Sequence, residues 1–82
     1  MYNKRKNERL FKKTISQENL RQRLLLYQEQ TGVTWASIVK QINEEYGDTL
    51  YASTLSSFKN GYKWLYDSTT QNVDKFLVSN KY

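Results

Sequence analysis

Apolar residues recur at helical spacing in two long stretches of the chain. In residues 17–30 they repeat at i, i+4 and i+7, as Leu20, Leu24 and Tyr27. A stronger stripe follows Thr34 and consists of Trp35, Ile38, Val39, Ile42 and Tyr46. Ser16 and Thr34 stand just before these stretches as candidate N-caps. The pattern predicts two amphipathic helices, over residues 17–30 and 35–46.

Two further stretches continue the helical pattern. Residues 51–60 carry Leu55 and Phe58 as apolar positions, and a last helix has Val73, Phe76 and Leu77 on its inward side. Asp67 or Ser68 opens that helix, and Ser68 with Gln71 fits a capping box. We expect the helix to fray over residues 79–82.

Glycine punctuates these stretches, because the three glycines stand at positions 32, 47 and 61 and proline is absent. Glycine adopts the left-handed conformation in which many helices end, so each glycine is a predicted helix stop. The chain therefore predicts an all-α fold, a compact four-helix domain over residues 15–82, preceded by an arm of residues 1–14.

Composition narrows the chemistry that is open to this domain. Its 82 residues suit one domain with one modest core. Cysteine and histidine are both absent, which removes disulfides, thiolate and imidazole catalysis, and the common zinc sites. No apolar run approaches the roughly 18 residues of a membrane span, and the first residues lack the apolar stretch that a signal peptide needs. We expect a cytoplasmic protein without metal, cofactor or membrane partner.

Catalysis has little support in the sequence. No glycine-rich elbow or phosphate loop frames a Ser/Lys pair as nucleophile and base. Glu44 and Glu45 are neighbours, so a helix sets their side chains about 100° apart, and we interpret them as a solvated face. We therefore expect no enzyme and no catalytic residue.

The aromatic residues divide into two groups. Most are expected in the core, because aromatic side chains supply much of the apolar surface that a small domain can bury. This group comprises Tyr27, Trp35, Tyr46, Phe58, Trp64 and Phe76. Tyr51, Tyr62 and Tyr66 lie in or beside loops, where a phenol can either reach a phosphate or pack, and both readings stay open.

Positive charge is concentrated at the start of the chain. Thirteen Lys and Arg oppose eight Asp and Glu, and residues 1–14 hold six of the basic residues against Glu8 alone, a net of +5. A basic arm on a near-neutral body is typical of nucleic-acid binders. The alternative is a solubilising tail.

The polar side of residues 51–60 is unusual for a helix that faces solvent. Ser53, Ser57 and Asn60 recur at i, i+4 and i+7 with Thr54 beside them, where Lys and Glu are more usual. Short hydroxyl side chains let a helix approach base edges in a major groove about 12 Å wide. The alternative is a small-residue face that packs against another helix or another protomer.

With these residues in place, the stretch from Val33 to Leu77 resembles the phage repressor (lambda repressor-like, Cro/CI) helix-turn-helix family. The resemblance rests on Val33-Thr34 at the start of the second helix, the glycine turn at Gly47, the apolar Leu50, and the run Thr54-Leu55-Ser56. It continues through Phe58 and Asn60-Gly61. The connection over residues 47–51 is about two residues longer than usual in the family.

The resemblance implies a recognition helix over residues 51–60 in the DNA major groove. Its implied base-contacting residues are Ala52, Ser53, Thr54 and Ser57. Its implied phosphate-contacting residues are Trp35, Asn60, Tyr62 and Lys63. Thr34, at the free N–H groups of a helix start, and Tyr51, beside a loop, are further phosphate-contacting candidates. Some members of the family extend a basic arm around the duplex, and the resemblance implies the same role for Lys4, Arg5 and Lys6. A glutamine common early in both helices of the family is replaced here by Trp35 and Ala52.

Two functions from different classes fit this sequence. The first is a sequence-specific regulator of phage or plasmid type that binds double-stranded DNA and acts as a repressor or an activator. The second is a small phage- or plasmid-encoded module on the same scaffold that docks on a host protein, because fold alone does not separate the two. A homodimer and a monomer both stay open, since the family's dimer-forming fifth helix has no counterpart.

Overall fold

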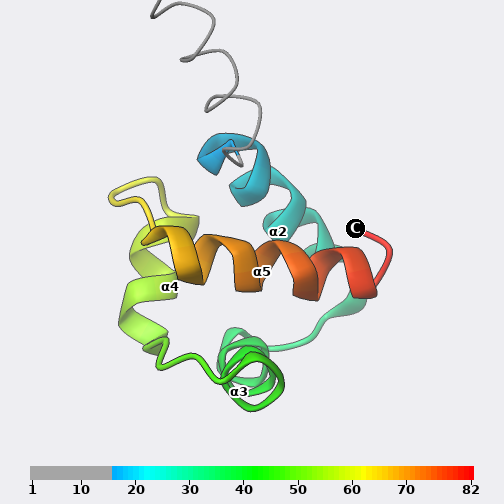
Figure 1. Cartoon of the computed structure of the whole chain (residues 1–82). Helices are drawn as coiled ribbons and strands as arrows, with labels where there is room; N and C mark the ends of the chain where they lie inside the picture. The colour runs from blue at the N-terminus through cyan, green and yellow to red at the C-terminus, as the bar shows by residue number, and fades with distance from the viewer. Residues whose placement is uncertain (1–15) are drawn as a thin grey trace, which may run out of the picture.

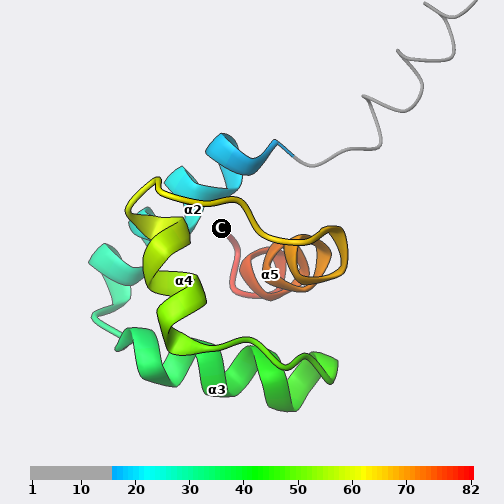
Figure 2. The same ribbon diagram turned by 90° about the vertical axis from the view of Figure 1, so that its left-hand side faces the viewer.

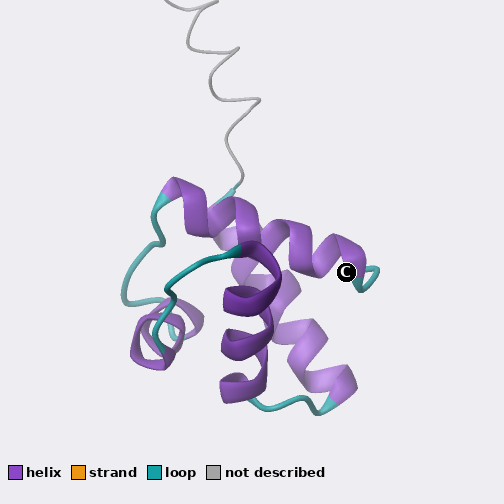
Figure 3. Cartoon of the chain, turned by 60° about the horizontal axis from the view of Figure 1, so that its bottom comes forward, coloured by secondary structure: helices purple, strands orange, loops and turns teal. Residues whose placement is uncertain are grey.

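The computed structural model describes residues 16–82 (Figure 1). These residues contain four α-helices joined by loops. They are α2 (Gln17–Thr31), α3 (Trp35–Tyr46), α4 (Ala52–Lys59) and α5 (Asp67–Ser79). Figure 3 shows loops joining them and no strand among these residues. The all-α fold with four helices is confirmed. The predicted arm, including Lys4, Arg5 and Lys6, lies outside the described residues.

The first two helices begin and end as their sequences predict. The Ser16 hydroxyl oxygen accepts from the Asn19 backbone N–H at 3.2 Å, and that of Thr34 accepts from the Ser37 N–H at 3.2 Å. Gly32 and Gly47 follow the helices with φ of 72° and 67°, the left-handed region that favours glycine. Local capping chemistry is therefore enough to set these boundaries.

All four helices contribute to one core. Leu20 and Leu24 come from α2, and the other fully buried residues are Ile38 and Ile42 of α3, Leu55 and Phe58 of α4, and Val73, Phe76 and Leu77 of α5. Tyr27 of α2 packs edge-on against Phe76, with ring centroids 5.3 Å apart. Figures 1 and 2 show α5 crossing the domain with the other helices packed around it. The apolar stripes read from the sequence are thus the core faces.

Three of the predicted core residues are not fully buried. Trp35 and Tyr46 are half-buried against the core, whereas Trp64 is 55% exposed, so its assignment to the core was wrong. Leu65 is the buried residue of this loop instead. The Trp64 ring meets Phe58 edge-on, with 6.4 Å between ring centroids.

The start of α5 corrects the predicted capping box. Tyr66 is the N-cap residue and has no side-chain capping bond, so Ser68 is the second residue of the helix and cannot cap it. The prediction was wrong because packing sets this boundary: Thr69 and Thr70 are buried, and the Thr70 N–H donates to the Tyr66 oxygen at 2.8 Å.

Residues 80–82 do not fray as predicted. The Tyr82 N–H donates to the Leu77 oxygen at 2.8 Å and the Lys81 N–H to the Val78 oxygen at 2.9 Å, which closes the helix end. The Tyr82 ring lies 5.2 Å from the Tyr27 ring, and its hydroxyl donates to Gln30 at 2.7 Å. Contacts with α2 therefore order this segment.

Within residues 16–82, no helix combines the length and the apolar character needed to cross a membrane.

Candidate nucleic-acid interface

The connection between α3 and α4 is held by a side-chain amide. Asn43 donates from Nδ2 to the Leu50 oxygen at 2.9 Å and accepts at Oδ1 from the Leu50 N–H at 2.8 Å. Residues 47–51 therefore fold back beside the last turns of α3 before α4 begins. Because both polar groups of the buried Leu50 backbone are satisfied, the start of α4 is fixed against α3.

A second amide holds the loop that follows α4. Gln17 of α2 donates from Nε2 to the Leu65 oxygen at 2.9 Å and accepts at Oε1 from the Leu65 N–H at 3.1 Å. Its Nε2 also lies 3.1 Å from the Thr70 hydroxyl oxygen. The side-chain amides of Asn43 in α3 and Gln17 in α2 thus hydrogen-bond to the backbone before and after α4. These bonds fix the position of α4 on the surface.

Asp48 ties the α3–α4 connection to α5. Its carboxylate accepts from the Thr69 hydroxyl at 3.3 Å and from the Asn72 amide at 2.9 Å, and from the Thr49 N–H at 2.7 Å. The partly buried carboxylate is therefore bonded to donors from two segments. The connection cannot move without breaking these bonds.

The outer face of α4 carries the predicted base-contacting residues. Ala52 and Ser53 are exposed, and Thr54 and Ser57 are half-buried on its two flanks. Among residues 16–82, the hydroxyls of Ser53, Thr54 and Ser57 have no side-chain hydrogen bond. The four residues share a helix that Figure 2 shows on the near side of the domain, with α3 below it and the loop after α4 above it.

One residue of this face was missed from the sequence. Ser56 is exposed and lies at i+3 from Ser53 and i+4 from Ala52, so helical geometry places it on the same face. The i, i+4, i+7 series of Ser53, Ser57 and Asn60 does not include Ser56, so the sequence pattern did not predict this residue as part of the face. The outward surface of α4 therefore presents Ala52, Ser53, Ser56 and Asn60 in the middle, with Ser57 and Thr54 toward the flanks.

The predicted phosphate-contacting residues lie around this helix, at different depths. Tyr51, Tyr62 and Lys63 are exposed at its two ends. Thr34 uses its hydroxyl oxygen as a helix cap, and Asn60 accepts at Oδ1 from the Lys59 ammonium at 3.4 Å. The half-buried Trp35 ring lies 5.3 Å from the Lys59 ammonium nitrogen, a cation–π contact that joins the start of α3 to the end of α4.

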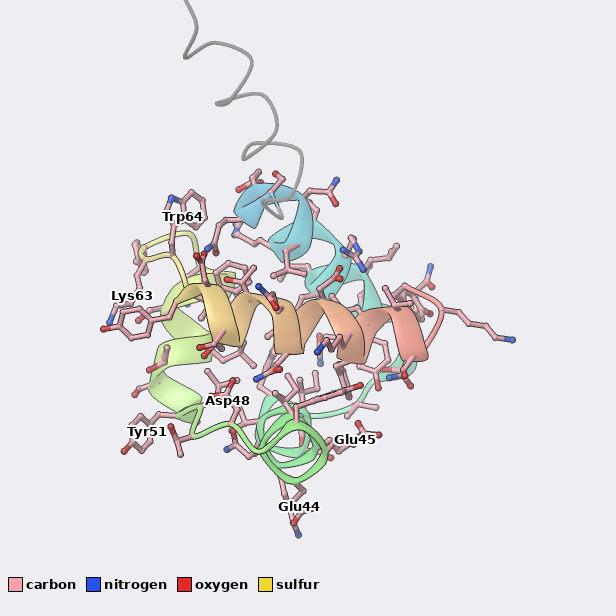
Figure 4. All side chains as sticks on the ribbon, viewed as in Figure 1. Glu44, Glu45, Asp48, Tyr51, Lys63 and Trp64 are labelled. Carbon is pink, nitrogen blue, oxygen red and sulfur yellow. The ribbon has the colours of Figure 1, made fainter. Side chains whose placement is uncertain are left out.

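Glu44 and Glu45 of α3 lie away from the outer face of α4. Figure 4 shows Tyr51, Lys63 and Trp64 on the side where α4 lies, whereas Glu44 and Glu45 point in other directions from α3. Both glutamates are exposed, as a solvated face requires. The α4 side is therefore free of these two carboxylates, while Lys59 and Lys63 stand beside its hydroxyl-bearing face.

A groove of about 360 Å³ opens next to this face. It runs between the α3–α4 connection and the loop after α4, and both α4 and α5 begin at it. The lining residues are Asp48, Thr49, Leu50, Tyr51, Thr54, Lys63, Trp64, Leu65, Tyr66 and Thr69. Tyr51, Thr54 and Lys63 thus belong both to the groove and to the predicted DNA-contacting set, so the two surfaces are continuous.

No protein-family model, no curated protein and no solved structure matched the chain when it was compared with each kind.

Proposed function

We propose that this protein binds double-stranded DNA in a sequence-specific manner and acts as a transcriptional regulator, with α4 as the helix that enters the major groove. The observation that carries the proposal is the outer face of α4. It is short, uncharged and rich in hydroxyls, and it belongs to a helix that is pinned at both ends.

The chemistry of this face suits base edges. Serine and threonine hydroxyls donate or accept hydrogen bonds there, and the methyl groups of Ala52 and Thr54 suit the methyl group of thymine. Small side chains also let the helix backbone approach the groove closely. Tyr51 and Lys63 at the two ends of α4 would reach the phosphates that border the groove.

The helix-turn-helix resemblance supports the same reading. In it, α3 lies across the DNA backbone and α4 in the groove, with Thr34 and Trp35 near a phosphate. The five-residue connection from 47 to 51 is longer than in the family, but Asn43 and Asp48 hold it in one conformation. The longer connection is expected to change the tilt of α4 in the groove.

In this proposal, the arm of residues 1–14 provides most of the affinity for DNA. Residues 16–82 contain equal numbers of basic and acidic residues, so the net charge of +5 resides in the first fourteen residues. Phosphate contacts release counterions, so binding should weaken steeply with rising salt. Specificity would come from α4 and affinity from the arm and from Lys59 and Lys63.

A protein-docking function is the alternative, and one observation favours it. Four aromatic residues are strongly exposed near α4, namely Tyr51, Tyr62, Trp64 and Tyr66. Tyrosine and tryptophan are enriched where proteins bind proteins. Such an interface would show little of the salt dependence that phosphate contacts produce.

Selection from random duplex DNA tests the proposal. The full-length protein is incubated with the pool, bound fragments are amplified, and the affinity of the enriched duplex is measured between about 50 and 200 mM salt. We expect enrichment of one motif and a linear fall of log affinity with log salt. If no motif is enriched after repeated rounds at low salt, the proposal is wrong.

A further inference from the structure

The groove beside α4 is built from two equivalent helix starts. Tyr51-Ala52-Ser53-Thr54 opens α4 and Tyr66-Asp67-Ser68-Thr69 opens α5, with tyrosine as the N-cap residue in both. The tyrosine and the threonine of each segment line the groove. Two phenol rings from separate segments therefore border one cavity.

Both tyrosine side chains are largely exposed to solvent. Tyr51 is 69% exposed and Tyr66 is 85% exposed, and both line the groove. Aromatic rings at such positions stack on nucleobases whatever the base, because every base has a π face. The groove thus offers stacking surface that the fold itself does not use.

The rest of the lining is polar, which argues against a purely apolar occupant. The Asp48 carboxylate is fixed by Thr69 and Asn72, and Thr54 has a hydroxyl without a side-chain partner among the described residues. An aliphatic side chain placed here would desolvate these groups without pairing them. The edge of a nucleobase carries amino and carbonyl groups that can pair with the carboxylate and the hydroxyl.

Among residues 16–82, one cation and one carboxylate line the groove. Lys63 is exposed and can meet a phosphate, whereas the Asp48 carboxylate already accepts hydrogen bonds from Thr49, Thr69 and Asn72. Gln17, at the start of α2, is bonded to Leu65, which also lines the groove. The first turn of α2 is therefore hydrogen-bonded to the lining of this groove.

We infer that this groove holds one unpaired nucleotide, with its base against Tyr51 and Tyr66 and its phosphate at Lys63. The inference rests on the proposed function for the class of ligand, since Tyr51 and Thr54 belong to both surfaces. The groove adds affinity for a single-stranded stretch, which α4 alone would not bind.

Fluorescence anisotropy with labelled single strands of about eight nucleotides tests the inference on the full-length protein. The probes are the four homopolymers dT, dA, dC and dG at low salt. Tyr66→Ala should weaken binding by about 5- to 150-fold, because one ring no longer stacks on the base. Tyr66→Phe should retain most of the affinity, because the ring remains.

Val78→Ala is the control. Val78 is 61% exposed on α5 and does not line the groove, so its removal should change affinity by less than about two-fold. Circular dichroism verifies that each variant is folded. Equal losses of affinity in Tyr66→Ala and Val78→Ala, or the absence of single-strand binding by the wild-type protein, would overturn the inference.

The two proposals fail separately. If the wild-type protein retards its selected duplex but binds no single strand, the groove has another occupant, such as a protein side chain, and duplex recognition by α4 stands. If single strands bind through Tyr66 and no duplex motif is selected, duplex recognition fails and the groove inference stands.

Discussion

Arg21 of α2 reaches the last residue of α4, where its Nε donates to the Lys59 backbone oxygen at 2.9 Å. The same guanidinium pairs with Glu18 at 3.0 Å and lies under Gly61, where an added Cβ would meet its Nε at 3.7 Å. A carbonyl at a helix C-terminus has no partner inside the helix, so this bond satisfies a group that α4 cannot satisfy itself.

Arg21→Ala should therefore destabilise the domain. The bond that it removes joins a charged donor to a backbone carbonyl, and such bonds contribute roughly 1.5–3 kcal/mol. Urea denaturation followed by circular dichroism measures the change. Gln22→Ala is the control, because Gln22 is exposed and, within residues 16–82, its side chain bonds only to Glu18, so its effect should stay within about 0.5 kcal/mol. Equal effects of both substitutions would contradict the assigned role.

Asn43→Ala should loosen the start of α4. It removes both partners of the buried Leu50 backbone, and a buried group left without a partner costs roughly 1–3 kcal/mol. The midpoint of urea unfolding should fall, and amide exchange at Leu50 should speed up. Gln41→Ala on the same helix is the control, since Gln41 is exposed and its side chain bonds only to Ser37, at 3.3 Å. Unchanged exchange at Leu50 would show that the amide does not hold it.

Ser53→Glu or Ser57→Glu should abolish retardation of the selected duplex while the domain stays folded. A carboxylate on the outer face of α4 would meet phosphates and base acceptors in the groove. Ser79→Glu adds the same group at the far end of α5 and should leave binding nearly unchanged. If both α4 variants still retard the duplex at wild-type concentrations, α4 is not the recognition helix.

Deletion of residues 1–7 should weaken duplex binding and reduce its dependence on salt. The deletion removes Lys4, Arg5 and Lys6. The slope of log affinity against log salt should therefore shrink by up to about 3, near 0.9 for each phosphate that the arm no longer neutralises. Titrations at several salt concentrations measure it. An unchanged slope would show that the arm makes no phosphate contacts and is a solubilising tail.

What the sequence predicted well is what depends on local chemistry. Ser16 and Thr34 cap helices and Gly32 and Gly47 end them, because each of these roles involves residues within about four positions. Asp67 is the first residue of α5, which agrees with one of the two predicted starts, but the predicted capping box was wrong, because Ser68 lies inside the helix and the N-cap residue Tyr66 makes no side-chain capping bond.

The site was predicted less completely, because its supports link distant residues. Gln17 and Leu65 are 48 positions apart. No local sequence pattern predicts that a side-chain amide of α2 hydrogen-bonds to the backbone of the loop after α4. The groove, too, exists only once the starts of α4 and α5 are brought together. Ser56 is different, since its spacing from Ala52 and Ser53 was visible in the sequence.

The two amide clamps have a consequence for how this protein can change over time. Asn43 and Gln17 hold α4 through the backbone of Leu50 and Leu65, and Leu55 and Phe58 hold it through the core, so its outward residues carry almost none of the folding energy. The exposed positions 52, 53 and 56 are therefore free to vary, and a library randomised there without proline should keep the fold while differing in what it binds.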